Sequence, residues 1–68
     1  MAKPITLSYL SRKARSDNSI LYDFDGQEEW IPISQIEDDS NDPEDPDLDG
    51  ESGDVEIPLW LAKDRGLD

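Results

Sequence analysis

The residues of this sequence that could do chemistry are almost all carboxylates. Among 68 residues there are 18 Asp and Glu against 6 Lys and Arg, which gives a formal net charge of −12, and there is no His and no Cys. Imidazole and thiolate catalysis, disulfides and Cys- or His-based metal sites are therefore excluded for this chain. Carboxylates can still bind hard cations, act as acid–base pairs, or attract basic surfaces.

One run of acids has the spacing of a calcium-binding loop. The pattern D-x-D-x-D-G-x5-E of the EF-hand loop is matched by Asp45, Asp47, Asp49, Gly50 and Glu56. In such loops alternate carboxylates converge on the cation, the glycine permits a sharp turn, and the last glutamate binds with both oxygens. A proline at the second position, a serine where the family has an apolar residue, and the absence of predicted flanking helices argue against the match. We expect no cofactor, and we keep calcium at Asp45, Asp47, Asp49 and Glu56 as an alternative.

Two pairs of neighbouring carboxylates, Glu28 with Glu29 and Asp23 with Asp25, could in principle do acid–base chemistry. Catalysis would require an environment that separates the pKa values of the two members of a pair. Nothing in the surrounding sequence predicts such burial, so we expect that the protein is not an enzyme.

The two tryptophans could act as platforms on which nucleic-acid bases stack. Stacking aromatics normally lie in a basic groove, whereas Trp30 follows two glutamates and Trp60 comes shortly after Glu56. We therefore expect both tryptophans to pack in the core.

The charge is divided unevenly along the chain. Residues 1–16 contain four bases and no acid, and ten of the 18 acids lie between residues 37 and 54, where there is no base. That segment has two prolines, two glycines and a single apolar residue, Leu48, so it cannot bury enough surface to offset its ordering entropy. We predict a single small domain over residues 1–68, with an acidic, flexible loop at 37–54.

The loop acids are the residues that we expect to contact a partner. They are Glu37, Asp38, Asp39, Asp42, Glu44, Asp45, Asp47, Asp49, Glu51 and Asp54. The bases of the N-terminal segment are Lys3, Arg12, Lys13 and Arg15. They support an alternative in which a small β-barrel module contacts DNA or RNA directly, although the acidity of the remaining chain opposes binding to phosphates.

The elements that must position these residues are short strands. The alternation of apolar residues predicts strands over 5–9, 20–24, 27–33 and 55–58. For the first of these, a short helix over Leu7, Leu10 and Ala14 is an alternative. Asp25-Gly26 between two apolar runs predicts a hairpin, because both residues tolerate a positive φ. Residues 34–36 resemble a single helical turn. A final helix over 59–65 is expected to begin after Pro58 and to end at Gly66.

These elements predict a fold that is mainly β, with one short C-terminal helix closing a small three- to four-stranded antiparallel sheet or open barrel. The residues expected to supply most of the core are Trp30, Trp60, Tyr22, Phe24, Ile31, Ile33, Ile36, Ile57 and Leu61. A chain this short buries only about 60% of its unfolded surface, so its stability should be modest.

Two pieces of the sequence resemble a group of small, largely uncharacterised proteins encoded by bacteriophages and prophages. The pattern is W-I-P-x-S-Q-I at residues 30–36, followed by I-P-x-W-L-A-x-x-x-G-L at residues 57–67. The resemblance implies a phage origin and a compact β domain, and it carries over no catalytic residue. The spacer between the two motifs is longer and more acidic here than in the usual pattern.

A second resemblance concerns Leu21-Tyr22-Asp23-Phe24, which is similar to the ALYDY element of Src-homology-three domains. In those domains a long loop and three strands follow that element before the tryptophan, whereas here five residues separate Phe24 from Trp30. We do not expect binding of proline-rich peptides.

The charge itself is then the feature that best indicates a function. A loop with ten acids can approach the charge density of duplex DNA, which presents about one charge per 1.7 Å of axis. Such a surface can be steered into a basic groove. The hypothesis is a phage-encoded acidic binding protein that inhibits a host nuclease, polymerase or defence effector by nucleic-acid mimicry in the host cytoplasm. No signal peptide or membrane-spanning segment is predicted.

Overall fold

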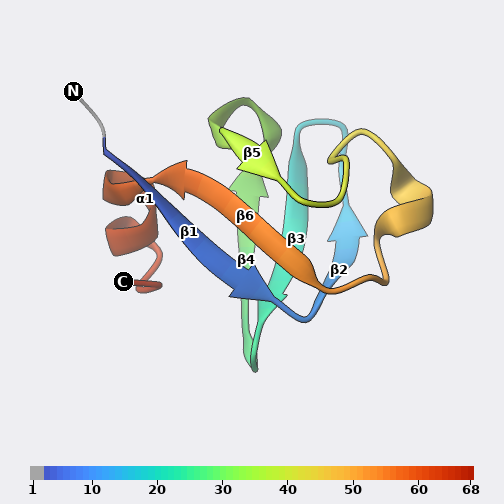
Figure 1. Cartoon of the computed structure of the whole chain (residues 1–68), viewed down its shortest axis with the longest axis horizontal. Helices are drawn as coiled ribbons and strands as arrows, with labels where there is room; N and C mark the ends of the chain where they lie inside the picture. The colour runs from blue at the N-terminus through green and yellow to red at the C-terminus, as the bar shows by residue number, and fades with distance from the viewer. Residues whose placement is uncertain (1–2) are drawn as a thin grey trace.

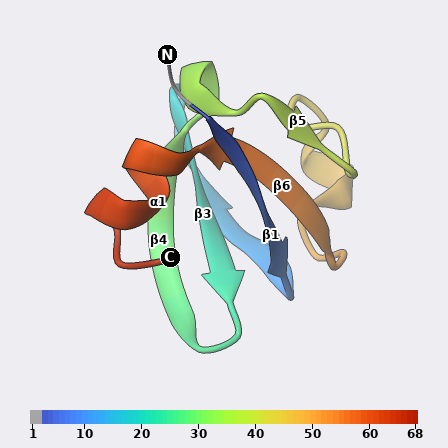
Figure 2. The same cartoon turned by 60° about the vertical axis from the view of Figure 1, so that its left-hand side comes forward.

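The computed structural model describes residues 3–68 and contains two three-stranded antiparallel sheets (Figure 1). The first sheet has the order β1-β6-β5, with β1 at Pro4–Tyr9, β6 at Gly53–Pro58 and the short β5 at Asp38–Asp39. The second has the order β2-β3-β4, with β2 at Ser11–Arg15, β3 at Ser19–Phe24 and β4 at Gln27–Pro32. The chain passes from the first sheet to the second at Leu10, and Figure 2 shows the two sheets packed face to face.

Short helical segments lie outside the sheets. The 3-10 turn η1 spans Ile33–Gln35, and η2 spans Pro46–Leu48 within the acidic segment. The helix α1 spans Leu59–Asp64 at the end of the molecule opposite η2 (Figure 1). Gly66 follows the helix at a φ of 71°, and the Leu67 amide donates to the Ala62 carbonyl at 2.7 Å, so the C-terminal stop is the predicted one.

The hairpin between β3 and β4 follows from its two turn residues. Asp25 and Gly26 have φ values of 60° and 96°, as a two-residue turn with matched twist requires. The Asp23 side chain accepts a hydrogen bond from the Gly26 amide at 2.9 Å. This turn fixes the register, so that Ile20 faces Ile31 across the strands and Leu21 faces Trp30.

The core lies between the two sheets and under α1. Its buried residues are Tyr9, Ile20, Tyr22, Ile31, Val55, Ile57, Leu61 and Ala62. The rings of Tyr9 and Tyr22 meet edge to face with centroids 4.8 Å apart, and Tyr22 stacks on Phe24 at 5.6 Å. The predicted class, mainly β with one short C-terminal helix, is confirmed, with six strands in residues 3–68 and no closed barrel.

The prediction that the tryptophans pack in the core is wrong. Trp30 is 44% exposed and Trp60 is 54% exposed. Trp30 precedes the buried Ile31, so the alternation along β4 turns it to the outer face of the sheet. Trp60 occupies the exposed side of α1, whose buried side is formed by Leu61 and Ala62. Tyr9 and Tyr22, not the two tryptophans, are the buried aromatic residues of the core.

A bulge in β2 places two arginines on the inner face of the second sheet. Arg12 pairs with Tyr22 and Arg15 pairs with Ile20, and the register shifts between residues 12 and 14. Residues three apart on a regular strand point to opposite faces, but the extra residue at Lys13 places both arginines on the inner face. The sequence did not predict β2 as a strand.

Candidate functional site

Arg12 is a buried arginine that holds the acidic segment against the second sheet. The residue is 2% exposed. Its guanidinium donates to the carbonyl oxygens of Asn41 and Asp42, both at 3.0 Å, and to that of Asp45 at 2.9 Å. It also donates to the Asp39 carboxylate at 3.4 Å. Three carbonyls from one loop therefore converge on a single side chain, which closes the loop around it.

Asp39 is the buried carboxylate that balances this charge. It accepts hydrogen bonds from the hydroxyl of Tyr9 and from that of Tyr22, the latter at 2.6 Å. The backbone amide of Asn41 also donates to the Asp39 carboxylate, at 3.0 Å. A buried charge requires both an opposite charge and hydrogen bonds, and Asp39 has both.

Arg15 and Asp49 form the second attachment. The Nε of Arg15 donates to Oδ2 of Asp49 at 2.8 Å, and its Nη2 donates to Oδ1 at 2.5 Å, which is the bidentate geometry that arginine prefers for carboxylates. The remaining Nη1 donates to the Pro43 carbonyl at 3.0 Å. Arg15 holds the pKa of the Asp49 carboxyl below its usual value. The Nε of Arg12 lies 3.0 Å from Asp49 Oδ1 as an ion pair without an aligned hydrogen bond.

The acidic segment also covers the edge of β2. The backbone amide of Arg12 donates to the Asp49 carbonyl at 2.6 Å. An uncovered strand edge is a template for pairing with other chains, and here the loop covers it. The flexibility predicted for residues 37–54 stays a prediction, but the segment contains β5, η2 and the start of β6 and is tied at Arg12 and Arg15.

The two tyrosines next to Asp39 resist ionisation. Burial and, second, the hydrogen bond donated to Asp39 raise the pKa of Tyr9 to about 12 from 10.0. The same two causes raise the pKa of Tyr22 well above its ordinary value. Because the folded state disfavours the phenolates, the stability that these groups contribute is complete below pH 10 and is lost as the pH rises toward 12.

We expect this loss to be visible in a spectrophotometric titration. The chain has two tyrosines, so all tyrosinate absorbance reports on this cluster. Tyrosinate should stay absent near pH 10 and then form together with the loss of the far-ultraviolet circular dichroism of the fold. Free tyrosine amide in the same buffer gives the reference curve. Ionisation of either residue near pH 10 with the fold intact would contradict the hydrogen bonds to Asp39.

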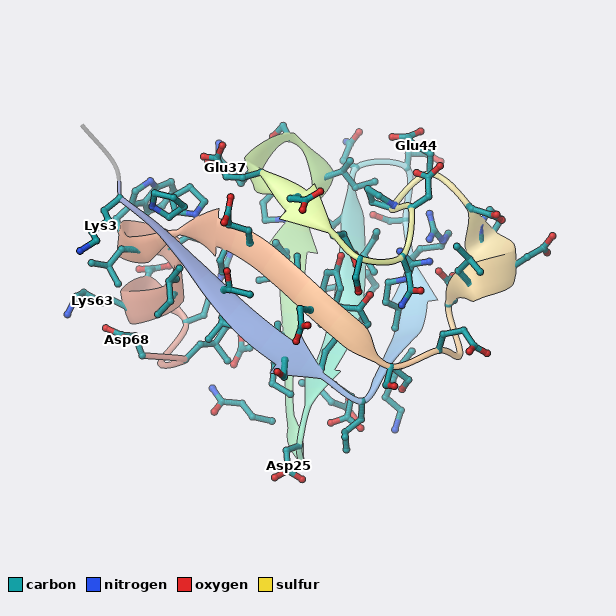
Figure 3. The ribbon with its side chains drawn as sticks, viewed as in Figure 1. Lys3, Asp25, Glu37, Glu44, Lys63 and Asp68 are labelled. Carbon is teal, nitrogen blue, oxygen red and sulfur yellow. The ribbon has the colours of Figure 1, made fainter. Side chains whose placement is uncertain are left out.

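The remaining acids of the segment point outward. Of the ten predicted contact residues, Asp39 is buried, Asp45 and Asp49 are half-buried, and seven are exposed. The exposed ones are Glu37, Asp38, Asp42, Glu44, Asp47, Glu51 and Asp54. Figure 3 shows Glu44 on the side of the molecule away from Lys3 and Lys63, which lie at the end with α1. Asp39 and Asp49 thus bind the segment to the domain, and the seven other acids are exposed on its surface.

The outer face of the first sheet continues this acidic surface. Val55 and Ile57 of β6 are buried, so Asp54 and Glu56 point to the opposite face. Asp38 lies directly across from Glu56 in the register of β5 and β6, and Ser8 of β1 donates to Asp54 at 2.7 Å. Like charges placed opposite each other destabilise a sheet, so this face carries an electrostatic cost. We call the seven exposed acids together with Glu56 the acidic surface.

The residues of the calcium pattern do not converge. Asp49 is bound to Arg15, and Glu56 lies in β6 opposite Asp38. Asp45 caps η2 by accepting from the Asp47 amide at 3.0 Å. Across residues 3–68 no group of three or more acidic side chains is placed to hold one metal ion. Calcium binding stays an untested alternative.

The four bases of the N-terminal segment do not form one cluster, although Arg12 and Arg15 share the carboxylate of Asp49. Arg12 and Arg15 are engaged with the acidic segment, and Lys13 pairs with Glu28 at 3.3 Å on the outer face of the second sheet. Lys3 lies at the end of the molecule near α1 (Figure 3). Two of the four bases, Arg12 and Arg15, thus anchor the acidic segment, and direct contact of the four with DNA or RNA stays an untested alternative.

Comparisons of this chain with protein-family models, with curated protein sequences and with solved structures found no match. No helix within residues 3–68 is long and apolar enough to cross a membrane. The resemblance to phage-encoded proteins therefore stays a prediction, and the function has to be argued from the geometry above.

Proposed function

We propose that this protein binds the basic nucleic-acid groove of another protein through its acidic surface and thereby excludes nucleic acid from that groove. The observation that carries the proposal is the division of the acids. Asp39 and Asp49 face inward onto arginines, which fixes the backbone of the segment, while seven acids of the same segment are exposed. A carboxylate array whose backbone is already held loses less conformational entropy on binding than a disordered tail.

The charge density of the molecule supports mimicry of a nucleic acid. Twelve net negative charges along a molecule 33 Å long amount to one charge per about 2.8 Å. A duplex presents roughly one charge per 1.7 Å of axis and each of its strands one per about 3.4 Å. The molecule as a whole lies between these two values, so a groove that attracts DNA or RNA electrostatically would also attract this protein.

The class of partner follows from the same chemistry and from the resemblance noted in the sequence. A phage-encoded protein of this kind would act in the host cytoplasm on a nuclease, a polymerase or a defence effector. Such a complex forms through many exposed charge contacts, so its affinity should fall steeply as the salt concentration rises.

The test is capture from a bacterial lysate followed by elution with duplex DNA. The wild-type protein should retain nucleic-acid-binding proteins that duplex DNA releases at low salt. A loop variant, Glu37→Gln/Asp47→Asn/Glu51→Gln, removes three exposed acids whose side chains make no hydrogen bond within residues 3–68, and it should retain roughly tenfold less of the same proteins. Each captured protein is then assayed for DNA binding in the presence of the purified protein.

A matched control removes the same number of charges elsewhere. The variant Asp25→Asn/Glu28→Gln/Asp64→Asn leaves the loop intact and has the same net charge as the loop variant. Equal loss in both variants, or captured proteins that DNA does not release, would overturn the proposal. Retardation of a DNA or RNA probe by the wild-type protein itself would instead support the alternative of direct nucleic-acid binding.

A further inference from the structure

An open groove of about 610 Å³ lies where the acidic segment approaches the second sheet. Its walls are the turn between β2 and β3, the start of η1, and Glu44 of the loop. Two of the following hydrogen bonds join these walls to one another, and the one within residues 16–19 shapes the turn. The Ile33 amide donates to the Asn18 carbonyl at 2.8 Å, the Ser19 amide donates to the Ser16 hydroxyl at 3.1 Å, and Arg15 donates to the Pro43 carbonyl at 3.0 Å. The groove is therefore formed before any ligand arrives.

The lining combines an apolar wall with two acids, whose negative charge the single lining base Arg15 balances only in part. Pro32 and Ile33 form the apolar part. Asp17 and Glu44 are exposed, and within residues 3–68 their carboxylates have no hydrogen-bond or ion-pair partner. Arg15 is the only base in the lining, and three of its five N–H donors are bound to Asp49 and Pro43. A ligand of this groove should bring an apolar stem and a positive charge.

We propose that the groove binds an arginine side chain of the partner, which deepens the proposed function and rests on it. The aliphatic stem would pack on Pro32 and Ile33, and the guanidinium would lie between Asp17 and Glu44. Arginine fits better than lysine because its planar head carries five donors that can reach two carboxylates at once, whereas an ammonium is a compact point charge. Nucleic-acid grooves present arginine for phosphate, so the same side chain would meet this site.

The probe is a short acetylated and amidated peptide in which arginine alternates with glycine, together with versions that carry lysine or citrulline instead. Citrulline has the shape of arginine without its charge. Amide chemical shifts of the labelled full-length chain, followed during titration at low salt, should change around residues 16–18, 33–34 and 44. The arginine peptide should bind several-fold more tightly than the lysine peptide, and citrulline should abolish binding.

Two variants with equal net charge decide between the groove and diffuse acidity. Asp17→Asn/Glu44→Gln should weaken binding of the arginine peptide by about tenfold, and Asp25→Asn/Asp64→Asn by less than about twofold. Asp25 lies at the hairpin end, away from Glu44 (Figure 3). Equal losses of peptide affinity in the two variants, or chemical-shift changes spread over the whole acidic surface, would overturn the proposal that the groove binds arginine. Either result would leave the proposal of nucleic-acid mimicry intact. Peptide binding at the groove without any partner that DNA releases would support the groove and overturn the proposed function.

Discussion

Replacing Arg12 with methionine is expected to lower the free energy of unfolding by about 3–5 kcal/mol, because it leaves a buried carboxylate without its counter-charge. Asp39 would keep its hydrogen bonds from Tyr9 and Tyr22, but its negative charge would have no buried partner. Three loop carbonyls would lose their donor at the same time. A domain of this size is stabilised by only about 3–10 kcal/mol, so much of the variant should be unfolded at room temperature.

Urea unfolding followed by circular dichroism measures this effect. Lys13→Met is the matched control, because Lys13 is the next residue, is exposed, and pairs only with Glu28. It should change the free energy of unfolding by less than about 0.5 kcal/mol. The double variant Arg12→Met/Asp39→Asn should recover part of the loss, since the amide oxygen can accept from one tyrosine hydroxyl and the amide nitrogen can donate to the other, without a buried charge. An Arg12→Met variant as stable as the wild type would show that the arginine does not hold the loop.

The local elements of the fold were predictable because their signals lie within a few residues. Asp25-Gly26 specified the hairpin through the positive φ that both residues adopt. Gly66 ended the helix for the same reason. The alternation at Val55 and Ile57 located β6, whose buried face is the predicted one. Each of these features depends on backbone preferences or on side-chain alternation along one segment.

The bulged strand β2 and the anchoring of the acidic segment were not predictable, because they depend on contacts between distant residues. The strand β2 carries few apolar residues, and its inner face is formed by arginines that only a bulge aligns. The carboxylate that Arg12 requires lies 27 residues further on. The sequence carried one signal of this anchoring: residues 1–16 contain four bases and no acid, and residues 37–54 contain ten acids and no base. This distribution indicated opposite charges but not that they pair inside the molecule.

Gly53 is a further residue whose role depends on contacts with residues distant in the sequence. A Cβ at this position would lie 2.7 Å from the side-chain nitrogen Nδ2 of Asn41 and 2.8 Å from the Tyr9 hydroxyl. The residue must therefore be glycine for the hydrogen bond between these two groups to form here. Asn41 donates to Tyr9 and to the Ser52 carbonyl, both at 3.0 Å. In the sequence this glycine indicated only a flexible loop. In the structure it leaves room for the Asn41 side chain to reach the Tyr9 hydroxyl.

The acids of the segment therefore belong to two functional groups that composition alone does not separate. Those that face inward give the segment its shape, and those that face outward give it its charge. This division predicts that substitutions of the inward acids will alter partner binding through shape, whereas substitutions of the outward acids will alter it through charge. Asp49 and Asp47 are two residues apart and belong to different groups, so they allow a direct comparison.

Asp49→Asn should release the segment although it removes only one charge. The variant loses the bidentate pair with Arg15 and the ion pair with Arg12, and hydrogen bonds between charged groups contribute about 1.5–3 kcal/mol. We expect the free energy of unfolding to fall by about 2 kcal/mol. Amide hydrogen exchange over residues 41–51 should become much faster, while exchange in β3 and β6 keeps its order. Asp47→Asn, with the same net charge, should leave both exchange and stability nearly unchanged.

The pH dependence separates the role of Asp49 from general acidity. Because Arg15 lowers the pKa of Asp49 in the folded state, its contribution to stability is complete above the ordinary value of 3.8 and is lost as the pH falls through the folded value. Wild-type stability should therefore fall as the pH drops below about 4, whereas Asp49→Asn should lack the part of that fall that comes from the ion pair with Arg15. If both proteins lose the same stability in acid, the ion pair with Arg15 does not hold the segment, and partner binding by Asp49→Asn should then match that of Asp47→Asn.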